Sequence, residues 1–147
     1  MRVLMLTRQV NPAATFFAFT HGWIRALAAR VTQLDVICQE GTDAGLPANV
    51  SLVSLGKDRG AGKSRQWCTF EQAAFRLVPR ADVVFGHMMP QYAIAAMPAA
   101  LVNGKPVVQW YTLGHVEPSI RLAHRLVARV VTASRESFPL PSRKLSV

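Results

Sequence analysis

The chain has 147 residues, of which 50% are hydrophobic and 17% are charged, and its formal net charge is +9. This composition excludes a disordered chain, and the length is typical of one domain that buries roughly 70% of the surface exposed by its unfolded chain. No apolar run approaches the roughly 20 residues that a helix needs to cross a bilayer.

Strand-like and helix-like segments alternate along the chain. In chain order, strands are predicted at 2–7, 34–39, 50–55, 82–86, 106–111, 130–133 and 144–147. Helices are predicted between them, at 17–31, 64–78, 90–103 and 117–129. Most of the strands are continuous runs of Val, Ile and Leu, which is typical of parallel strands covered on both faces. The alternation therefore predicts an α/β domain with a Rossmann-like, doubly wound and mainly parallel sheet.

Two common nucleotide-binding motifs do not fit. The loop 56–63, with Ser64, resembles a P-loop, but it is one residue too long and follows the third strand rather than the first. No glycine lies between Met1 and Gly22, where a dinucleotide-binding domain carries its first G-x-G-x-x-G turn. Cys38, Cys68, the four histidines and the eight acidic residues form no metal-ligand cluster. The sequence predicts neither a cofactor nor a metal ion.

The positive charge is concentrated in two segments. Residues 57–80 contain six basic and two acidic residues, and residues 121–147 contain six basic residues and one acidic residue. Such segments suggest an anionic partner, either a phosphate-bearing ligand or lipid headgroups, or else simply a solvated surface. Nucleic acid is disfavoured, because interleaved aromatic residues and helix-turn-helix or zinc patterns are missing. Three arginines spaced by four residues in the last predicted helix form a candidate basic surface: Arg121, Arg125 and Arg129.

Gly-His pairs lie at or beyond the ends of two predicted strands. His87 follows Gly86, and His115 follows Gly114 a few residues beyond the next strand. Ligands of open α/β sheets bind beyond the carboxyl ends of the strands, where a histidine can exchange a proton or donate a hydrogen bond to a hydroxyl. For each histidine a purely structural role is the alternative.

Further polar residues are expected around the same cleft. Arginine provides a fork that matches phosphate, whereas serine catalysis lacks a G-x-S-x-G segment. With His87, the cleft candidates are Arg8, Asn11, His21, Ser134, Arg135 and Glu136.

Five segments in order resemble the amino-terminal domain of retaining glycosyltransferases of the GT-B fold, family 4. They are 7–11, 19–23, 82–92, 110–115 and 131–137. The resemblance implies that 1–147 is a single acceptor-side domain, half of a GT-B fold. In that family a hydroxyl acceptor meets a nucleotide-sugar donor held by the carboxyl-terminal domain. It also implies that His115 is the catalytic histidine that reaches toward donor sugar and acceptor, and that the loop 8–17 faces the donor phosphates.

The sequence departs from the family in two places. The Gly-Gly pair that the family often has in its first loop is replaced by Phe17-Ala18-Phe19, and the paired glutamates of the donor domain, E-x7-E, have no counterpart. We therefore expect the donor-binding domain to be absent and the chain alone to be inactive.

Two other functions remain open at this point. One is a non-catalytic module that binds a partner chain or an anionic membrane through 57–80 and 121–144, and the other is a separate Rossmann-like enzyme for small molecules. The apolar start of the chain, residues 1–6, is too short for the core of a signal peptide. The sequence thus predicts a cytoplasmic protein, with peripheral contact at the inner face of the membrane as an option.

Overall fold

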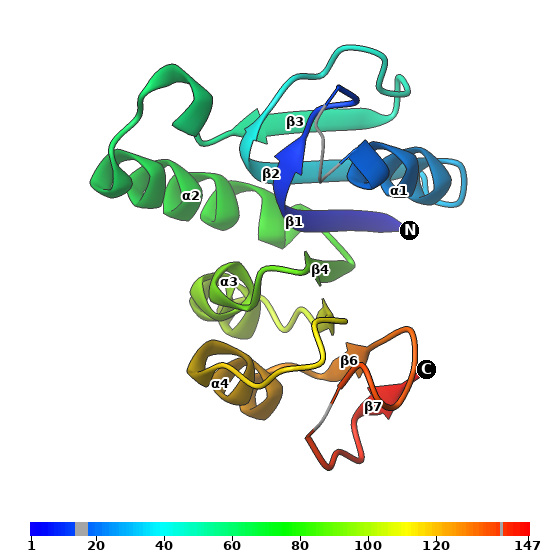
Figure 1. Ribbon diagram of the computed structural model, residues 1–147. Helices are drawn as coiled ribbons and strands as arrows, with labels where there is room; N and C mark the ends of the chain where they lie inside the picture. The colour runs from blue at the N-terminus through cyan, green and yellow to red at the C-terminus, as the bar shows by residue number, and fades with distance from the viewer. Residues whose placement is uncertain (14–17, 139) are drawn as a thin grey trace.

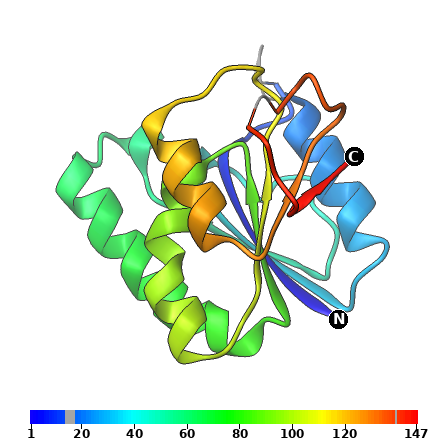
Figure 2. The same cartoon turned by 90° about the horizontal axis from the view of Figure 1, so that it is seen from below.

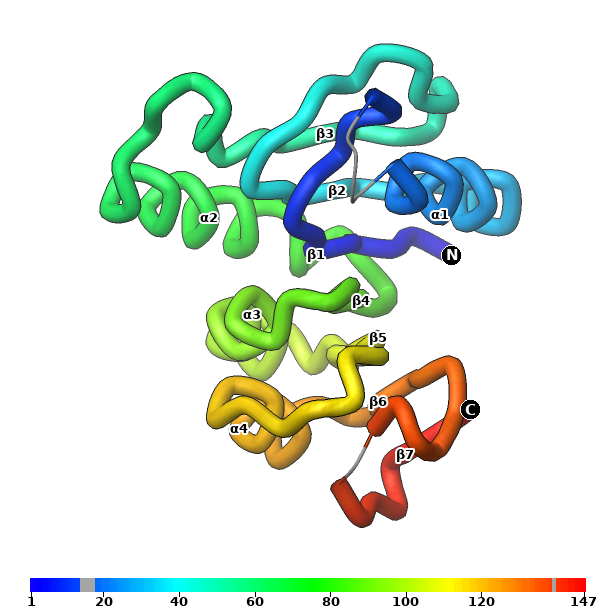
Figure 3. Tube along the Cα trace, in the orientation of Figure 1, coloured from blue at the N-terminus to red at the C-terminus, as the bar shows by residue number. Residues whose placement is uncertain are grey.

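The computed structural model describes residues 1–13, 18–138 and 140–147. Within these ranges, seven parallel strands form one sheet in the order β3-β2-β1-β4-β5-β6-β7. The strands are β1 (Arg2–Val10), β2 (Gln33–Gly41), β3 (Val50–Ser54), β4 (Val83–His87), β5 (Val107–Trp110), β6 (Arg129–Val131) and β7 (Leu145–Ser146). The chain builds the sheet outward from β1 to β3, returns to β4 on the other side of β1, and continues outward to β7 (Figure 3).

Helices cover both faces of the sheet. They are α1 (Ala18–Ala28), α2 (Lys63–Leu77), α3 (Pro90–Val102) and α4 (Pro118–Leu126), with short 3-10 turns η1 (Lys57–Arg59) and η2 (Val78–Arg80). Figure 1 shows α1 on one face and α2, α3 and α4 on the opposite face. The predicted Rossmann-like, doubly wound sheet is confirmed. The direction of winding reverses between β1 and β4, and this switch point is where such sheets bind ligands.

Side chains of each central strand alternate between two hydrophobic cores. In β1, Leu4 and Leu6 are fully buried in the core beneath α2, α3 and α4. Val3 and Met5 point the other way, into the core beneath α1. Because both faces are covered in the middle of the strand, residues 3–6 are all apolar, which explains the continuous hydrophobic run in the sequence.

The last predicted helix ends earlier than expected, and this changes the predicted basic surface. Helix α4 ends at Leu126, the backbone becomes extended at Val127, and Arg129 is the first residue of β6. The Nζ of Lys144 donates hydrogen bonds to the carbonyl oxygens of His124, Arg125 and Val127 at 2.9–3.1 Å. A cation at this end is favourable for the helix dipole and satisfies carbonyls that lack partners within the helix. The prediction that Arg121, Arg125 and Arg129 share one helical face is therefore wrong: only Arg121 and Arg125 lie on α4.

Candidate functional site

Two loops meet beyond the carboxyl ends of β5 and β6. The backbone N–H of Gly114 donates to the carbonyl oxygen of Ser137 at 3.2 Å. Gly114 has a φ of +67°, a conformation that a side chain would strain. Figure 2 shows both loops at the same end of the sheet. This contact places the loop of His115 against the turn that contains Ser134, Arg135 and Glu136.

His115 is exposed and is held by hydrogen bonds on both ring nitrogens. Its Nε2 lies 3.1 Å from Oε1 of Glu117, and its Nδ1 lies 3.1 Å from the carbonyl oxygen of Leu113. The side chain is 58% exposed, and the Tyr111 hydroxyl donates to the His115 carbonyl oxygen at 3.1 Å. The hydrogen bond to Glu117, followed by that to Leu113, raises the pKa of His115 above its ordinary value. The imidazole is therefore oriented, accessible and easily protonated.

Glu117 is a site residue that the sequence analysis missed. It caps the amino terminus of α4 with an extended backbone, and its Oε2 accepts a long hydrogen bond of 3.5 Å from the Ser119 hydroxyl. A carboxylate is stabilised at the positive end of a helix dipole. The available signal was a glutamate two residues after His115 and directly before Pro118, a residue suited to the first position of a helix.

His87 lies in the core, in contrast to His115. Its side chain is 1% exposed, and its Nδ1 is 3.1 Å from the Thr7 hydroxyl. Its ring packs 5.2 Å from Trp23 and 5.9 Å from Phe19 between centroids, both in α1, and 6.3 Å from Phe85. Burial lowers the pKa of His87 to about 4, so the ring is neutral at pH 7. The surroundings of His87 therefore fit the structural role that was the alternative for this histidine. Its imidazole lies beneath α1 and not at the open edge of the sheet.

The remaining candidates lie in the first strand, the first loop and the first helix, and the fold does not bring all of them to the carboxyl edge of the sheet. Asn11 accepts a hydrogen bond from the backbone of Ala13 at 2.9 Å, which fixes the start of the loop. His21 lies on α1, and its buried Nε2 has no partner among the described residues. Arg8 is exposed on β1 and interacts electrostatically with Tyr92. The rest of the loop predicted to face donor phosphates, residues 14–17, lies outside the described residues.

The turn after β6 is held together by its own side chains. The Ser134 and Ser137 hydroxyls are 3.0 Å apart, and Ser134 also accepts the Ser137 backbone N–H at 3.3 Å. Arg135 and Glu136 are exposed. Hydrogen bonds from its own backbone and from Ser134 lower the pKa of Glu136. This turn therefore offers one cation and one anion beside the His115 loop.

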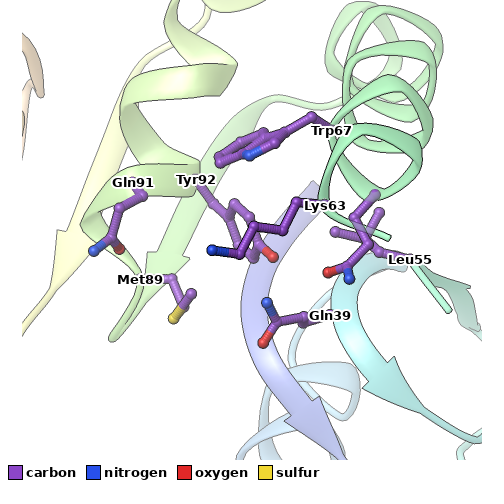
Figure 4. A pocket seen from close by; sticks show the side chains of 8 residues that line it. Gln39, Leu55, Lys63, Trp67, Met89, Gln91 and Tyr92 are labelled. Atoms are coloured by element: carbon purple, nitrogen blue, oxygen red, sulfur yellow. The ribbon is translucent and has the colours of Figure 1, made fainter. Parts of the chain in front are cut away.

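The β4–α3 connection links this site to a pocket nearby. Met88 has a φ of +60°, which is uncommon for a residue with a side chain. Its N–H donates to the Trp110 carbonyl oxygen at 3.0 Å, and its sulfur lies 3.5 Å from the Thr112 hydroxyl. The pocket has a volume of about 280 Å³ and lies where α2 and α3 begin (Figure 4). It is lined by Gln39, Leu55, Lys63, Gln66, Trp67, Met89, Gln91 and Tyr92.

Within the described ranges, no group of three or more His, Cys, Asp or Glu side chains could hold a metal ion.

Solved structures with a similar fold include an epimerase, a galactosyltransferase and a protein in complex with UDP and glucose. UDP-GlcNAc 2-epimerase from Methanocaldococcus jannaschii is 11% identical, with a TM-score of 0.67 over 100% of this chain and 45% of that chain. The lipopolysaccharide outer core galactosyltransferase WaaB is 11% identical, with a TM-score of 0.63 over 100% of this chain and 45% of that chain. Anabaena Alr3699/HepE, in complex with UDP and glucose, is 14% identical, with a TM-score of 0.57 over 93% of this chain and 39% of that chain.

These similarities establish the fold. Neither a protein-family model nor the sequence of a characterised protein matches the chain. The chain spans less than half the length of the structures that it resembles. Its Rossmann-like domain therefore corresponds to one half of a GT-B fold.

Proposed function

We propose that residues 1–147 form the acceptor-side domain of a retaining, family-4-like glycosyltransferase, which moves a sugar from a nucleotide-sugar donor to a hydroxyl acceptor. The observation that carries the proposal is the exposed His115–Glu117 pair at the carboxyl edge of half a GT-B fold. Support comes from the similarity to a galactosyltransferase and to a structure that contains UDP and glucose.

The pair has a plausible chemical task. Glu117 keeps the imidazole oriented and favours its protonated form. A protonated imidazole can donate a hydrogen bond to a substrate hydroxyl or stabilise negative charge that develops during transfer. Because exposed ion pairs contribute little free energy, a substrate can replace Glu117 as a partner of His115 at small cost.

The proposal assigns donor binding to a second domain. The similar structures are about twice as long as this chain, and the E-x7-E glutamates expected of the donor side are not in residues 1–147. We therefore expect turnover only when a donor-binding domain, on the same or on another chain, is present.

The test is a transfer assay on the enzyme completed with its donor-binding domain. Radiolabelled UDP- and GDP-sugars are supplied with an acceptor mixture, and label is expected in a product whose anomeric configuration, read by NMR, equals that of the donor. Conversion of UDP-N-acetylglucosamine to its C2 epimer, without transfer, would instead assign the chain to the epimerases.

A second candidate function is peripheral binding to an anionic membrane, for which α4 provides the observation. Leu122 and Leu126 are 45% and 41% exposed, and they alternate along the helix with the exposed Arg121 and Arg125. Exposed leucines beside arginines are typical of helices that lie at a membrane interface. Within the described residues, no helix is long and apolar enough to cross a membrane.

A further inference from the structure

The pocket between α2 and α3 lies at the amino termini of two helices. Helix α2 begins with Lys63 and α3 begins with Pro90, and neither helix has a side-chain hydrogen bond at its N-cap residue, Gly62 or Met89. The first N–H groups of a helix lack partners within the helix and carry the positive end of its dipole. Two such ends at one pocket favour an anion there.

An unpartnered hydroxyl group also lines this pocket. Tyr92 is only 4% exposed, and its ring stacks on Phe70 at 4.9 Å and meets the edge of Trp67 at 5.6 Å. These contacts fix the ring, and its hydroxyl, which has no hydrogen bond to another residue of the described ranges and is not a buried orphan, is open to water. Burial raises the pKa of Tyr92 to about 12, so the hydroxyl remains a donor at neutral pH. A donor held in place at the wall of a pocket can donate to a ligand there in place of water.

The charge of the pocket is positive. In Figure 4 the Lys63 ammonium lies in the middle of the pocket, with Trp67 on one side of it and Gln39 on the other. No carboxylate is among the residues that line the pocket, and Lys63 has no ion pair within the described ranges. Lys57 extends the positive charge, since its Nζ donates to Gln39 Oε1 at 3.3 Å.

The pocket can also hold more than a small anion. Trp67 is 43% exposed and offers an apolar face, and Gln91 adds an amide that can donate and accept hydrogen bonds. An apolar ring face beside amides suits a sugar or another polyol, which has C–H faces and hydroxyl edges.

We propose that this pocket binds a phosphate group carried by the acceptor, with the Lys63 ammonium, the Tyr92 hydroxyl, the first N–H groups of α2 and the Gln91 N–H of α3 as its donors. This inference rests on the proposed function and narrows the acceptor to a phosphorylated polyol. Met88, the neighbour of the pocket residue Met89, contacts Thr112 of the segment that leads to His115, so a phosphate bound here would leave the rest of the acceptor on the same side of the sheet as His115.

The test is titration of the 147-residue chain with glucose 6-phosphate, inorganic phosphate, glucose and UDP, by calorimetry at constant ionic strength. We expect saturable binding of glucose 6-phosphate, weaker binding of inorganic phosphate, and no binding of glucose. Lys63→Met is expected to weaken glucose 6-phosphate binding by about tenfold or more, because it removes a charge-assisted hydrogen bond. Tyr92→Phe, which keeps the ring packing, is expected to weaken binding by roughly fivefold.

The matched control is Lys105→Met, which removes the same charge from the connection between α3 and β5, at the opposite edge of the sheet. It is expected to bind glucose 6-phosphate like the wild type. Equal losses in Lys63→Met and Lys105→Met, or no binding of either phosphate, would overturn the inference. Tighter binding of UDP than of glucose 6-phosphate, lost in Lys63→Met, would assign the pocket to the donor instead. In each case the proposed function stands or falls separately, on the transfer assay of the completed enzyme.

Discussion

The buried neutral His87 predicts a specific loss of stability in acid. Its folded-state pKa of about 4 lies below the ordinary histidine pKa of 6.5, so the unfolded chain binds a proton that the folded chain excludes. The stability that His87 contributes is therefore intact above about pH 7 and falls as the pH decreases toward the folded-state pKa. From these two pKa values, the loss between pH 7 and pH 5 is about 2 kcal/mol.

The comparison variant is His87→Asn, because an asparagine amide can retain a hydrogen bond to the Thr7 hydroxyl but cannot titrate. The variant should be less stable at pH 7, because the smaller side chain leaves space among the rings of Trp23 and Phe85. Its stability should nevertheless fall by about 2 kcal/mol less than that of the wild type between pH 7 and pH 5.

Urea unfolding at the two pH values gives both free energies, and the difference between the two proteins removes the contributions of other titrating groups. If the wild type loses no more stability than His87→Asn, the imidazole titrates normally in the folded state. The buried position of His87 would then be refuted.

Three further outcomes are expected. Calorimetry of the 147-residue chain with UDP- and GDP-sugars should give little binding, and a micromolar Kd, about −8 kcal/mol, would contradict the assignment of donor binding to another domain. Sedimentation with anionic vesicles should be weak, salt-sensitive and reduced by Arg121→Gln/Arg125→Gln. The charge-matched control, Arg25→Gln on α1 with Arg30→Gln just after it, should not reduce it. Equal sedimentation with neutral vesicles at low salt would leave α4 as an ordinary solvated face. Lys144→Met should lower the free energy of unfolding by about 1–3 kcal/mol, because three carbonyl groups at the end of α4 lose their hydrogen-bond donor. Urea unfolding measures this change, and an unchanged midpoint would show that water replaces the ammonium without cost.

The fold could be predicted from the sequence because its strands are buried on both faces. Runs such as that around Leu4 and Met5 leave no alternative to a covered parallel strand, and all seven predicted strands are present. The end of α4 could not be predicted in the same way. The cation that caps it, Lys144, is 20 residues from His124 in the sequence, so the local spacing of arginines continued the helix too far.

From the sequence, the candidate site could be predicted only in the part that one loop contains, the loop of His115. His87 and His115 look alike in the sequence, since each follows a glycine near a strand end. Their surroundings differ because α1 covers the end of β4, and no local pattern reports that Phe19 and Trp23 reach His87. The pocket escaped prediction for the same reason. Its lining comes from four separate segments, around Gln39, Leu55, Lys63 and Tyr92, which only the folded sheet brings together.

The turnover of His115→Ala in the completed enzyme tests the central claim most directly. We expect kcat to fall by roughly 10²-fold or more, the size of one acid–base or electrostatic contact. The melting temperature should hardly change, because the side chain is 58% exposed and packs into neither core. Near-normal turnover together with a large drop in melting temperature would contradict the account and make His115 a structural residue.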